Sequence, residues 1–287
     1  MCGGMHAASS LAGVRVGGNQ PVRLMAAINV SPESFHAGSV RVDGGALRAA
    51  AQQAVDEGAD FIDIGAKSTA PYLDTEIPPD EEMRRMARAV EVVAAAVRVP
   101  VSADTVRAAV AVAALAAGAR IVNDVTGLRG DPAMADVAAQ AEGVVLVASP
   151  GGEDDGAPID LVLRALSESV ARARAAGIAP SEIVLDPGIG FFTRSGLPAT
   201  AFNCAVLGRL GAVADLGLPL LVGVSRKAFI GHLTGRTDPA ARLEGSLAAA
   251  ALAVYNGAAI IRTHDVGPTR DAVRVAEAIR AANSRRG

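Results

Sequence analysis

The chain has 287 residues, of which 51% are hydrophobic and 3% aromatic, and its formal net charge is −3. This length suits one large α/β domain with a sizeable apolar core. Acidic and basic residues are interspersed, and there is no Trp. Nucleic-acid-binding proteins instead carry a basic patch and stacking aromatic side chains. We therefore expect no nucleic-acid partner.

The cysteines and the first twenty residues indicate the cellular compartment of the protein. Cys2 and Cys204 give no disulfide framework and no metal-ligand spacing, which favours free thiols and a cytoplasmic location. Residues 1–20 are rich in small residues and lack the apolar core of a signal peptide, so we predict a flexible N-terminal tail. We expect no membrane association, because no apolar run reaches the roughly 20 residues of a membrane span.

Short apolar runs recur along residues 21–287, each followed by an Ala-rich amphipathic segment. Runs rich in Val, Ile and Leu are typical of parallel strands that are buried on both faces. The eight runs are Leu24–Val30, Phe61–Ile64, Val101–Asp104, Arg120–Val125, Val144–Ala148, Ile183–Leu185, Leu220–Val224 and Ala259–Arg262.

The segments between the runs carry helix start and stop signals. Asp131 and Asp238 each place a capping carboxylate before a Pro at the first helical position. Asp80–Glu82 forms an acidic first turn that suits the helix dipole. Four segments end at pairs that are typical of helix C-caps, namely Glu57-Gly58, Ala117-Gly118, Ala176-Gly177 and Asn256-Gly257.

Eight such βα units predict one α/β domain, a single (β/α)8 TIM barrel over residues 21–287. An open doubly wound sheet is the alternative. Such a sheet usually shows a Gly-x-Gly-x-x-Gly turn after its first strand. Here the first run continues instead into Asn29–Glu33.

Polar side chains gather where the predicted strands end, and that end of a barrel carries the chemistry of the fold. Burying so many polar groups is costly unless they are paired, so packing alone does not explain the set. Its members are Asn29, Asp63 with Lys67-Ser68-Thr69, Asp104, Asn123-Asp124, Asp186, Ser225-Arg226-Lys227 and Arg262-Thr263-His264-Asp265.

One group of these residues suits a flat heterocycle such as a pterin. Asp104, Asn123 and Asp186 offer acceptors for ring N–H and amino groups. Lys227 can donate to the ring carbonyl or N5, and Arg226 can lie flat against the ring face.

A second group suits a diphosphate. Arg262 can grip its oxygens with two parallel hydrogen bonds, and His264 lies beside it in sequence. Asn29 is the candidate ligand for a Mg²⁺ ion bound to the diphosphate. Ser68 and Thr69 add hydroxyls that can bind phosphate.

Several of these residues also have a structural interpretation. Asp104 precedes Thr105 and can cap the following helix, and Asp124 and Asp265 can fix their loops by hydrogen bonds. Asp63 lies within a strand, which favours a structural role. Lys67 can be an ordinary solvated loop lysine.

Many of these residues stand in strings that resemble the dihydropteroate synthases and the wider pterin-binding family. Leu185–Phe191 is similar to the family's L-D-P-G-x-G-F, and Val222–Lys227 is similar to V-G-x-S-R-K. The other similar strings are Asn29–Phe35 (N-V-T-P-D-S-F), Gly58–Gly65 with Ser68-Thr69 (G-A-D-x-I-D-I-G-G-E-S-T), Ser102–Thr105 (S-I-D-T), Val122–Asp124 (I-N-D), Arg242–Gly245 (R-L-E-G) and Arg262–Val266 (R-x-H-D-V).

The resemblance implies a transferase that condenses (7,8-dihydropterin-6-yl)methyl diphosphate with 4-aminobenzoate, giving dihydropteroate and diphosphate in folate biosynthesis. The residues similar to the family's pterin pocket are Asp104, Asn123, Asp186 and Lys227. Those similar to its diphosphate and Mg²⁺ site are Asn29, Thr69, Arg262 and His264. The candidate catalytic residues, which stabilise the departing diphosphate electrostatically, are Lys227, Arg262 and His264.

Two loops depart from the family pattern. The first loop, usually S-F-S-D-G-G, has Ala37 in place of its Asp. The second loop, usually E-S-T-R-P-G, has Lys67 in place of its Glu and Ala70 in place of its Arg. In the family, that Asp and Arg help to close the site over the aminobenzoate. We expect the acceptor side to be formed by Lys67, Ser68 and Thr69.

Three enzymatic or binding readings follow from these departures. The first is a divergent synthase that still uses 4-aminobenzoate. The second has the same chemistry with a phosphorylated arylamine of tetrahydromethanopterin-type biosynthesis, which Lys67 would suit. The third is a non-synthase relative that binds a pterin for methyl transfer or regulation.

A carrier or interaction protein that only retains the pocket is a further alternative. Relatives are often dimers, so the resemblance also implies a homodimer, with the Ala-rich seventh and eighth helices of the barrel as the expected interface.

Overall fold

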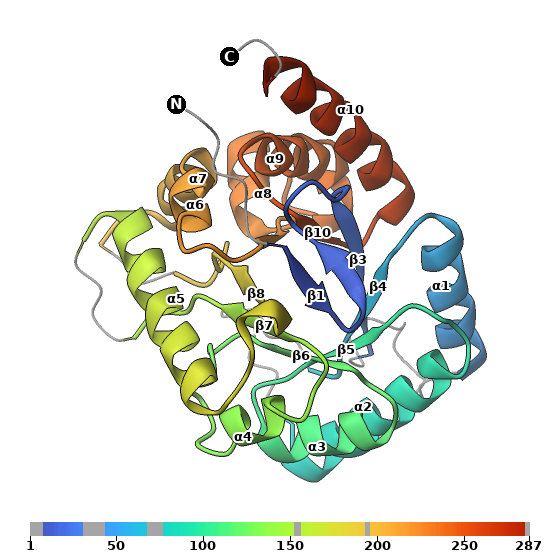
Figure 1. Cartoon of the computed structure of the whole chain (residues 1–287). Helices are drawn as coiled ribbons and strands as arrows, with labels where there is room; N and C mark the ends of the chain where they lie inside the picture. Colours follow the sequence, from blue (N-terminus) through green and yellow to red (C-terminus); the bar gives the residue numbers. More distant parts are fainter. Residues whose placement is uncertain (1–7, 31–43, 68–76, 152–155, 193–195, 285–287) are drawn as a thin grey trace.

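The computed structural model describes residues 8–30, 44–67, 77–151, 156–192 and 196–284, and its main sheet has eight parallel strands ringed by helices (Figure 1). The strands are β3 (Arg23–Asn29), β4 (Phe61–Gly65), β5 (Val101–Asp104), β6 (Ile121–Asp124), β7 (Val144–Val147), β8 (Ile183–Asp186), β9 (Leu221–Gly223) and β10 (Ile260–Thr263). Each coincides with one of the eight apolar runs, so the strand predictions are confirmed.

The strand order is β8-β7-β6-β5-β4-β3-β10-β9, and each neighbouring pair is parallel. A parallel bridge between Leu185 and Leu220 joins the two outer strands of this order, and Leu185 N–H donates to the Pro219 carbonyl over 2.9 Å. The sheet therefore closes on itself, which confirms the predicted (β/α)8 barrel and excludes the open doubly wound alternative.

Helices follow the strands and cover the outside of the barrel. They are α1 (Gly44–Asp56), α2 (Pro79–Ala94), α3 (Ala108–Ala116), α4 (Met134–Ala138), α5 (Pro158–Ala175), α6 (Ala199–Gly208), α7 (Leu210–Ala214), α8 (Ala228–Thr234), α9 (Leu243–Tyr255) and α10 (Val266–Ser284), with short 3-10 turns η2 (Pro180–Glu182) and η3 (Pro239–Arg242). None of the helices within the described residues is long and apolar enough to cross a membrane.

The helix ends follow the sequence signals. Asp238 caps η3 by accepting from the Ala240 N–H over 2.9 Å. Asp131 accepts from the Ala133 N–H over 3.0 Å and, with its other oxygen, from the Ala108 N–H over 2.8 Å, so it also serves the first turn of α3. The four predicted C-cap glycines all have positive φ, as that position favours, and they are Gly58, Gly118, Gly177 and Gly257.

Residues 9–16 correct the prediction of a flexible tail over residues 1–20. β1 (Ser9–Leu11) and β2 (Val14–Val16) form an antiparallel hairpin that lies across the amino-terminal end of the barrel (Figure 1). The turn residues Ala12 and Gly13 both have positive φ, as a two-residue hairpin turn requires. Strands of three residues are too short to give a periodic signal, which is why the sequence pattern missed them.

The hairpin closes the amino-terminal end of the barrel with apolar side chains. Leu11 and Val16 are fully buried there. Their cluster includes the inward side chains Met25, Phe61, Ile121, Val145, Val184, Leu221 and Ile260, one from each of seven barrel strands. Gly143 leaves room for this packing, because a Cβ there would lie 2.5 Å from Leu11 Cδ1.

Removing the Leu11 side chain should therefore destabilise the whole barrel. Leu11→Ala is expected to cost about 2–5 kcal/mol, measured as the free energy of unfolding in urea, because it leaves a cavity in a closed apolar cluster. Leu233→Ala is the matched control, since Leu233 is 61% exposed on α8. Equal unfolding free energies for the two variants would contradict the sealing role of the hairpin.

Candidate active site

Side chains from three strands meet inside the carboxyl-terminal half of the barrel around Arg262. Its Nε donates to Asp63 Oδ2 over 2.7 Å, and its Nη2 donates to Asp104 Oδ2 over 3.1 Å. Asn123 Nδ2 donates to the same Asp63 oxygen over 3.2 Å. The structure thus brings together three of the predicted site residues, and it adds Asp63, for which the sequence favoured only a structural role.

Three oxygens of this cluster are buried without a hydrogen-bond partner in the described structure, Asp63 Oδ1, Asp104 Oδ1 and Asn123 Oδ1. A buried acceptor without a donor is costly, and the two oxygens on Asp104 and Asn123, at the ends of their strands, are suited to a ligand that brings N–H groups. Burial, reinforced by the Asp63 charge, raises the pKa of Asp104 to about 7, although Arg262 opposes the shift.

Lys227 and Asp186 form a second pair beside this cluster. Lys227 follows β9 and donates from Nζ to the carbonyl of Ile189, and its Nζ lies 4.9 Å from the centre of the Phe191 ring. Burial lowers the pKa of Lys227 to about 8, and the Asp186 carboxylate opposes that shift. The charge of Arg262 lowers the pKa of both groups, so this pair is electrostatically connected to the first cluster.

The turn after β8 explains the Asp-Pro-Gly string. Asp186 Oδ1 accepts from the Gly188 N–H over 2.7 Å, which fixes the carboxylate at the strand end. Gly188 has φ +71°, and a Cβ there would lie 2.0 Å from the Ala148 carbonyl oxygen, so only glycine fits. Burial raises the pKa of Asp186, and Lys227 opposes the shift.

Arg226 lies at the edge of this site in an ion pair. Its Nε and Nη2 donate to the two oxygens of Asp265 over 3.0 and 2.5 Å. The residue has φ +58°, and its backbone is held by Ser246 Oγ, which accepts from its N–H, and by Arg242 Nη1, which donates to its carbonyl. This pair links the loops after β9 and β10, whereas the expected stacking of Arg226 on a ring stays a prediction.

His264 stands at the rim, where the residue is exposed on its outer side. Its backbone N–H donates to Ser225 Oγ over 3.2 Å, and its Nδ1 lies 3.0 Å from the same hydroxyl. Burial of the inner side of the ring, with the positive charges of Arg262 and Arg226, lowers the pKa of His264. The imidazole is therefore neutral at neutral pH and acts as a hydrogen-bonding group.

Of the remaining predicted site residues, the structure describes Asn29 and Lys67. Asn29 ends β3, and its Oδ1 lies close above Gly65, where a Cβ would be 3.1 Å away. Lys67 follows β4 and is half-buried. The predicted residues Ser68 and Thr69, and the departures Ala37 and Ala70, lie outside the described residues.

The hydrogen bonds show which of three aspartates have the structural role that the sequence allowed. Asp124 fixes its own loop, because it accepts from the N–H groups of Thr126 and Leu128, each over 2.8 Å. Asp104 does not cap α3, since Asp131 accepts from the Ala108 N–H that begins this helix. Asp265 holds Arg226, so its loop-fixing role is also seen.

Sequence analysis missed a buried carboxylate next to the site. Glu82 on α2 accepts from Thr105 Oγ1 over 2.8 Å and from Arg107 Nη1 over 2.6 Å, and so fixes the chain just after Asp104. The sequence offered one signal, namely the acidic first turn to which Glu82 belongs.

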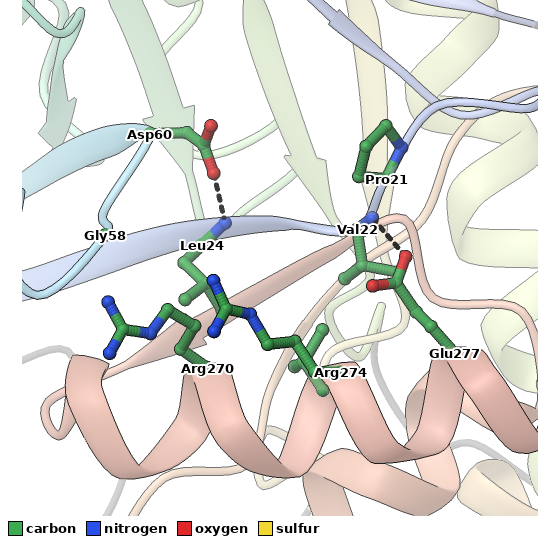
Figure 2. A pocket seen from close by; sticks show the side chains of 9 residues that line it. Pro21, Val22, Leu24, Gly58, Asp60, Arg270, Arg274 and Glu277 are labelled. Atoms are coloured by element: carbon green, nitrogen blue, oxygen red, sulfur yellow. Dashed lines mark hydrogen bonds between the residues drawn. The ribbon is translucent and has the colours of Figure 1, made fainter.

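A hollow of about 270 Å³ lies between α10 and the amino-terminal ends of β3 and β4, and its lining side chains are drawn in Figure 2. Its two carboxylates serve the backbone: Asp60 accepts from the Leu24 N–H and Glu277 accepts from the Val22 N–H. This end of a barrel maintains the fold. We therefore place the candidate active site at the opposite end, around Arg262.

Comparison with known proteins identifies the family of the chain. The family model described as "Pterin binding enzyme" matches residues 25–264. Dihydropteroate synthase of Neisseria meningitidis serogroup C is 39% identical over 274 residues, covering 90% of this chain and 92% of the relative. The Escherichia coli K12 enzyme is 35% identical over 265 residues, covering 89% and 90% of the two chains.

Solved structures agree. Dihydropteroate synthase of Xanthomonas albilineans with 4-aminobenzoic acid superposes with a TM-score of 0.86 at 38% identity, covering 96% of this chain and 99% of that one. The same enzyme in complex with 7,8-dihydropteroate gives a TM-score of 0.83 at 37% identity, with the same coverage. The chain therefore belongs to the pterin-binding enzyme family, within its dihydropteroate synthase-like transferases.

Proposed function

We propose that this protein condenses (7,8-dihydropterin-6-yl)methyl diphosphate with 4-aminobenzoate and releases dihydropteroate and diphosphate, as a step of folate biosynthesis. The observation that carries the proposal is the buried cluster of acceptors and cations around Arg262 at the carboxyl end of the barrel. A related barrel holds 7,8-dihydropteroate, which is the product of this reaction.

The acidic and amide side chains recognise the pterin in this proposal. Asp104 Oδ1 and Asn123 Oδ1 are buried acceptors without a donor, and they match N–H groups on a dihydropterin edge. Asp186 supplies a further carboxylate, and Lys227 donates to the ring carbonyl or N5. Arg226 is the weakest of these assignments, because its guanidinium is committed to Asp265.

In this proposal four side chains bind the diphosphate, namely Arg262, His264, Asn29 and Thr69. Nη1 of Arg262 remains for this task after Nε and Nη2 have bound their two carboxylates. The oxygens near Asn29 fit a Mg²⁺ ion, because its amide oxygen lies above Gly65 and the ion prefers oxygen ligands shared with substrate phosphates. When bound there, Mg²⁺ would neutralise charge on the diphosphate.

The reaction replaces a C–O bond by a C–N bond. The bond between the pterin methylene and the diphosphate oxygen breaks with both electrons leaving on the diphosphate, and the arylamine nitrogen then attacks the methylene and gives up a proton. Arg262 and Lys227 stabilise negative charge on the leaving group through fixed positions, which is electrostatic preorganisation. The acceptors around the ring favour the positive charge that the pterin carries in between.

The acceptor side keeps one alternative open. Lys67 stands after β4 where the family has Glu, and a cation at this place would suit a phosphorylated arylamine with the same chemistry. The relative that holds 4-aminobenzoic acid supports the first acceptor. A non-synthase role in methyl transfer or regulation gains no support from relatives that are named synthases.

We also propose a homodimer and a cytoplasmic location. Large apolar side chains stand exposed on the neighbouring helices α9 and α10, namely Leu252, Tyr255, Val275 and Ile279. Exposed apolar side chains on two adjoining helices are typical of a subunit interface, and these are the last two large helices of the barrel. The exposed Cys204 is a free thiol, as in a reducing compartment.

The decisive test is product formation by the purified protein. We expect the dihydropterin diphosphate with Mg²⁺ to raise the melting temperature, and 4-aminobenzoate to cause release of diphosphate and formation of dihydropteroate. Release only with a phosphorylated arylamine would favour the alternative acceptor. Absence of any melting shift would refute every function that requires an intact diphosphate site.

Two single variants should separate the halves of the site. Lys227→Ala is expected to abolish pterin binding, because it removes the buried cation beside Asp186. Arg262→Ala should weaken mainly the binding of diphosphate-bearing ligands, measured by calorimetry with the pterin alcohol and its diphosphate. Unchanged affinity in both variants would contradict the assignments.

The pH profile of kcat/KM for the pterin substrate should be bell-shaped with its maximum near neutrality. Protonation of Asp104, whose pKa is raised to about 7, removes an acceptor on the acid side. Deprotonation of Lys227, whose pKa is lowered to about 8, removes a cation on the basic side. Asp104→Asn should lose the acid limb of the profile. An acid limb caused by ionisation of the substrate diphosphate would instead persist in this variant. A flat profile across both values would contradict this prediction.

A further inference from the structure

Asp63 is a fully buried carboxylate in the interior of the barrel, two residues before Gly65, which pairs in register with Asp104. It lies in the middle of β4, paired in register with Ala27 on β3 and Ser102 on β5. A buried carboxylate costs several kcal/mol unless it is paired, so packing does not account for its presence. Its hydrogen bonds show what it does.

A single oxygen of Asp63 serves two partners on opposite sides. Oδ2 accepts from Arg262 Nε over 2.7 Å and from Asn123 Nδ2 over 3.2 Å. In the strand order, β10 and β6 each lie two strands away from β4. Side chains from alternate strands share a layer in such barrels, so Asp63 bridges the interior between them.

The bridge determines which way the Asn123 amide faces. An ionised carboxylate can only accept hydrogen bonds, so the NH₂ end of the amide must point to Asp63. The carbonyl oxygen Oδ1 is then directed away from Asp63, and it is buried without a partner. Without Asp63, nothing in these contacts would prevent the amide from turning by half a revolution and presenting a donor.

The same bridge orients Arg262. With Nε fixed on Asp63, Nη2 reaches Asp104 Oδ2 over 3.1 Å, and Asp104 Oδ1 remains without a partner. Asp63 therefore sets the direction of two acceptor oxygens on other side chains, Asn123 Oδ1 and Asp104 Oδ1. Each of these oxygens belongs to a side chain assigned to the pterin.

We infer that Asp63 is a positioning residue, which makes the pocket selective for N–H donors on the heterocycle by fixing the Asn123 amide and the Arg262 guanidinium. This inference rests on the proposed pterin-binding function and deepens it. Asp63 acts through these two side chains in this inference, so its effect should appear as lost selectivity between heterocycles.

The test compares the affinities of three heterocycles by calorimetry. They are a 7,8-dihydropterin, its analogue with a carbonyl in place of the exocyclic amino group, and the oxidised pterin, which lacks the N–H at ring N8. Asn123→Ala first shows which analogue the amide discriminates, with an expected loss of about tenfold in the affinity ratio. Asp63→Ala should reduce the same ratio by a similar factor.

Matched variants separate positioning from general destabilisation. Ser102→Ala removes a buried hydroxyl that pairs in register with Asp63 and has no hydrogen-bond partner in the described structure, so the affinity ratios should stay as in the wild type. The double variant of Asp63 and Asn123 should match Asn123→Ala alone, because the first residue acts through the second. If Asp63→Ala does not fold, Asp63→Ser replaces it, since the shorter hydroxyl cannot reach both partners.

An unchanged ratio in the Asp63 variant, with all three affinities reduced equally, would show a merely structural role and overturn the inference. A ratio that Asn123→Ala leaves unchanged would overturn it as well. If the wild-type protein bound none of the heterocycles, the proposed function would fail and this inference with it. Selective wild-type binding with an indifferent Asp63 variant would refute the inference alone.

Discussion

The site at the carboxyl end of this barrel depends on the pairing of its buried carboxylates with cationic side chains. Three carboxylates, Asp63, Asp104 and Asp186, lie in the interior, and two cations, Arg262 and Lys227, face them. Removing one member of a buried pair leaves an uncompensated charge, which is far more costly than losing a surface ion pair. The unpartnered oxygens of Asp104 and Asn123 match a ligand that supplies N–H groups, as the proposed function requires.

The two ends of the barrel divide the work of folding and of chemistry. At the amino-terminal end, the β1–β2 hairpin and seven inward apolar side chains form an apolar closure. At the carboxyl end, Arg226 and Asp265 tie together the loops after β9 and β10 through an ion pair. Glu82 similarly fixes the chain after Asp104. The polar site is thus supported from outside by groups that need not touch substrate.

The eight barrel strands could be predicted because Val- and Ile-rich runs and C-cap glycines are local signals. The grouping of Asp104, Asn123, Asp186 and Arg262 was also predictable, since parallel strands deliver their ends to one place. Partner choice was not predictable. Arg226 meets Asp265, 39 residues away, and Asp63 meets Arg262, 199 residues away, and no local pattern encodes such pairs. The hairpin escaped notice because its strands have only three residues each.

The hairpin also has a consequence for the order in which the chain acquires structure. Residues 9–16 leave the ribosome before any barrel strand, yet β1 packs against η2 and β8, far along the chain, and the apolar cluster that contains Leu11 also includes Leu221 and Ile260. Contacts between such distant parts of a chain form late, because the loop between them must first be closed. We therefore expect this short segment to dock only after the distant strands that form its binding surface have been made.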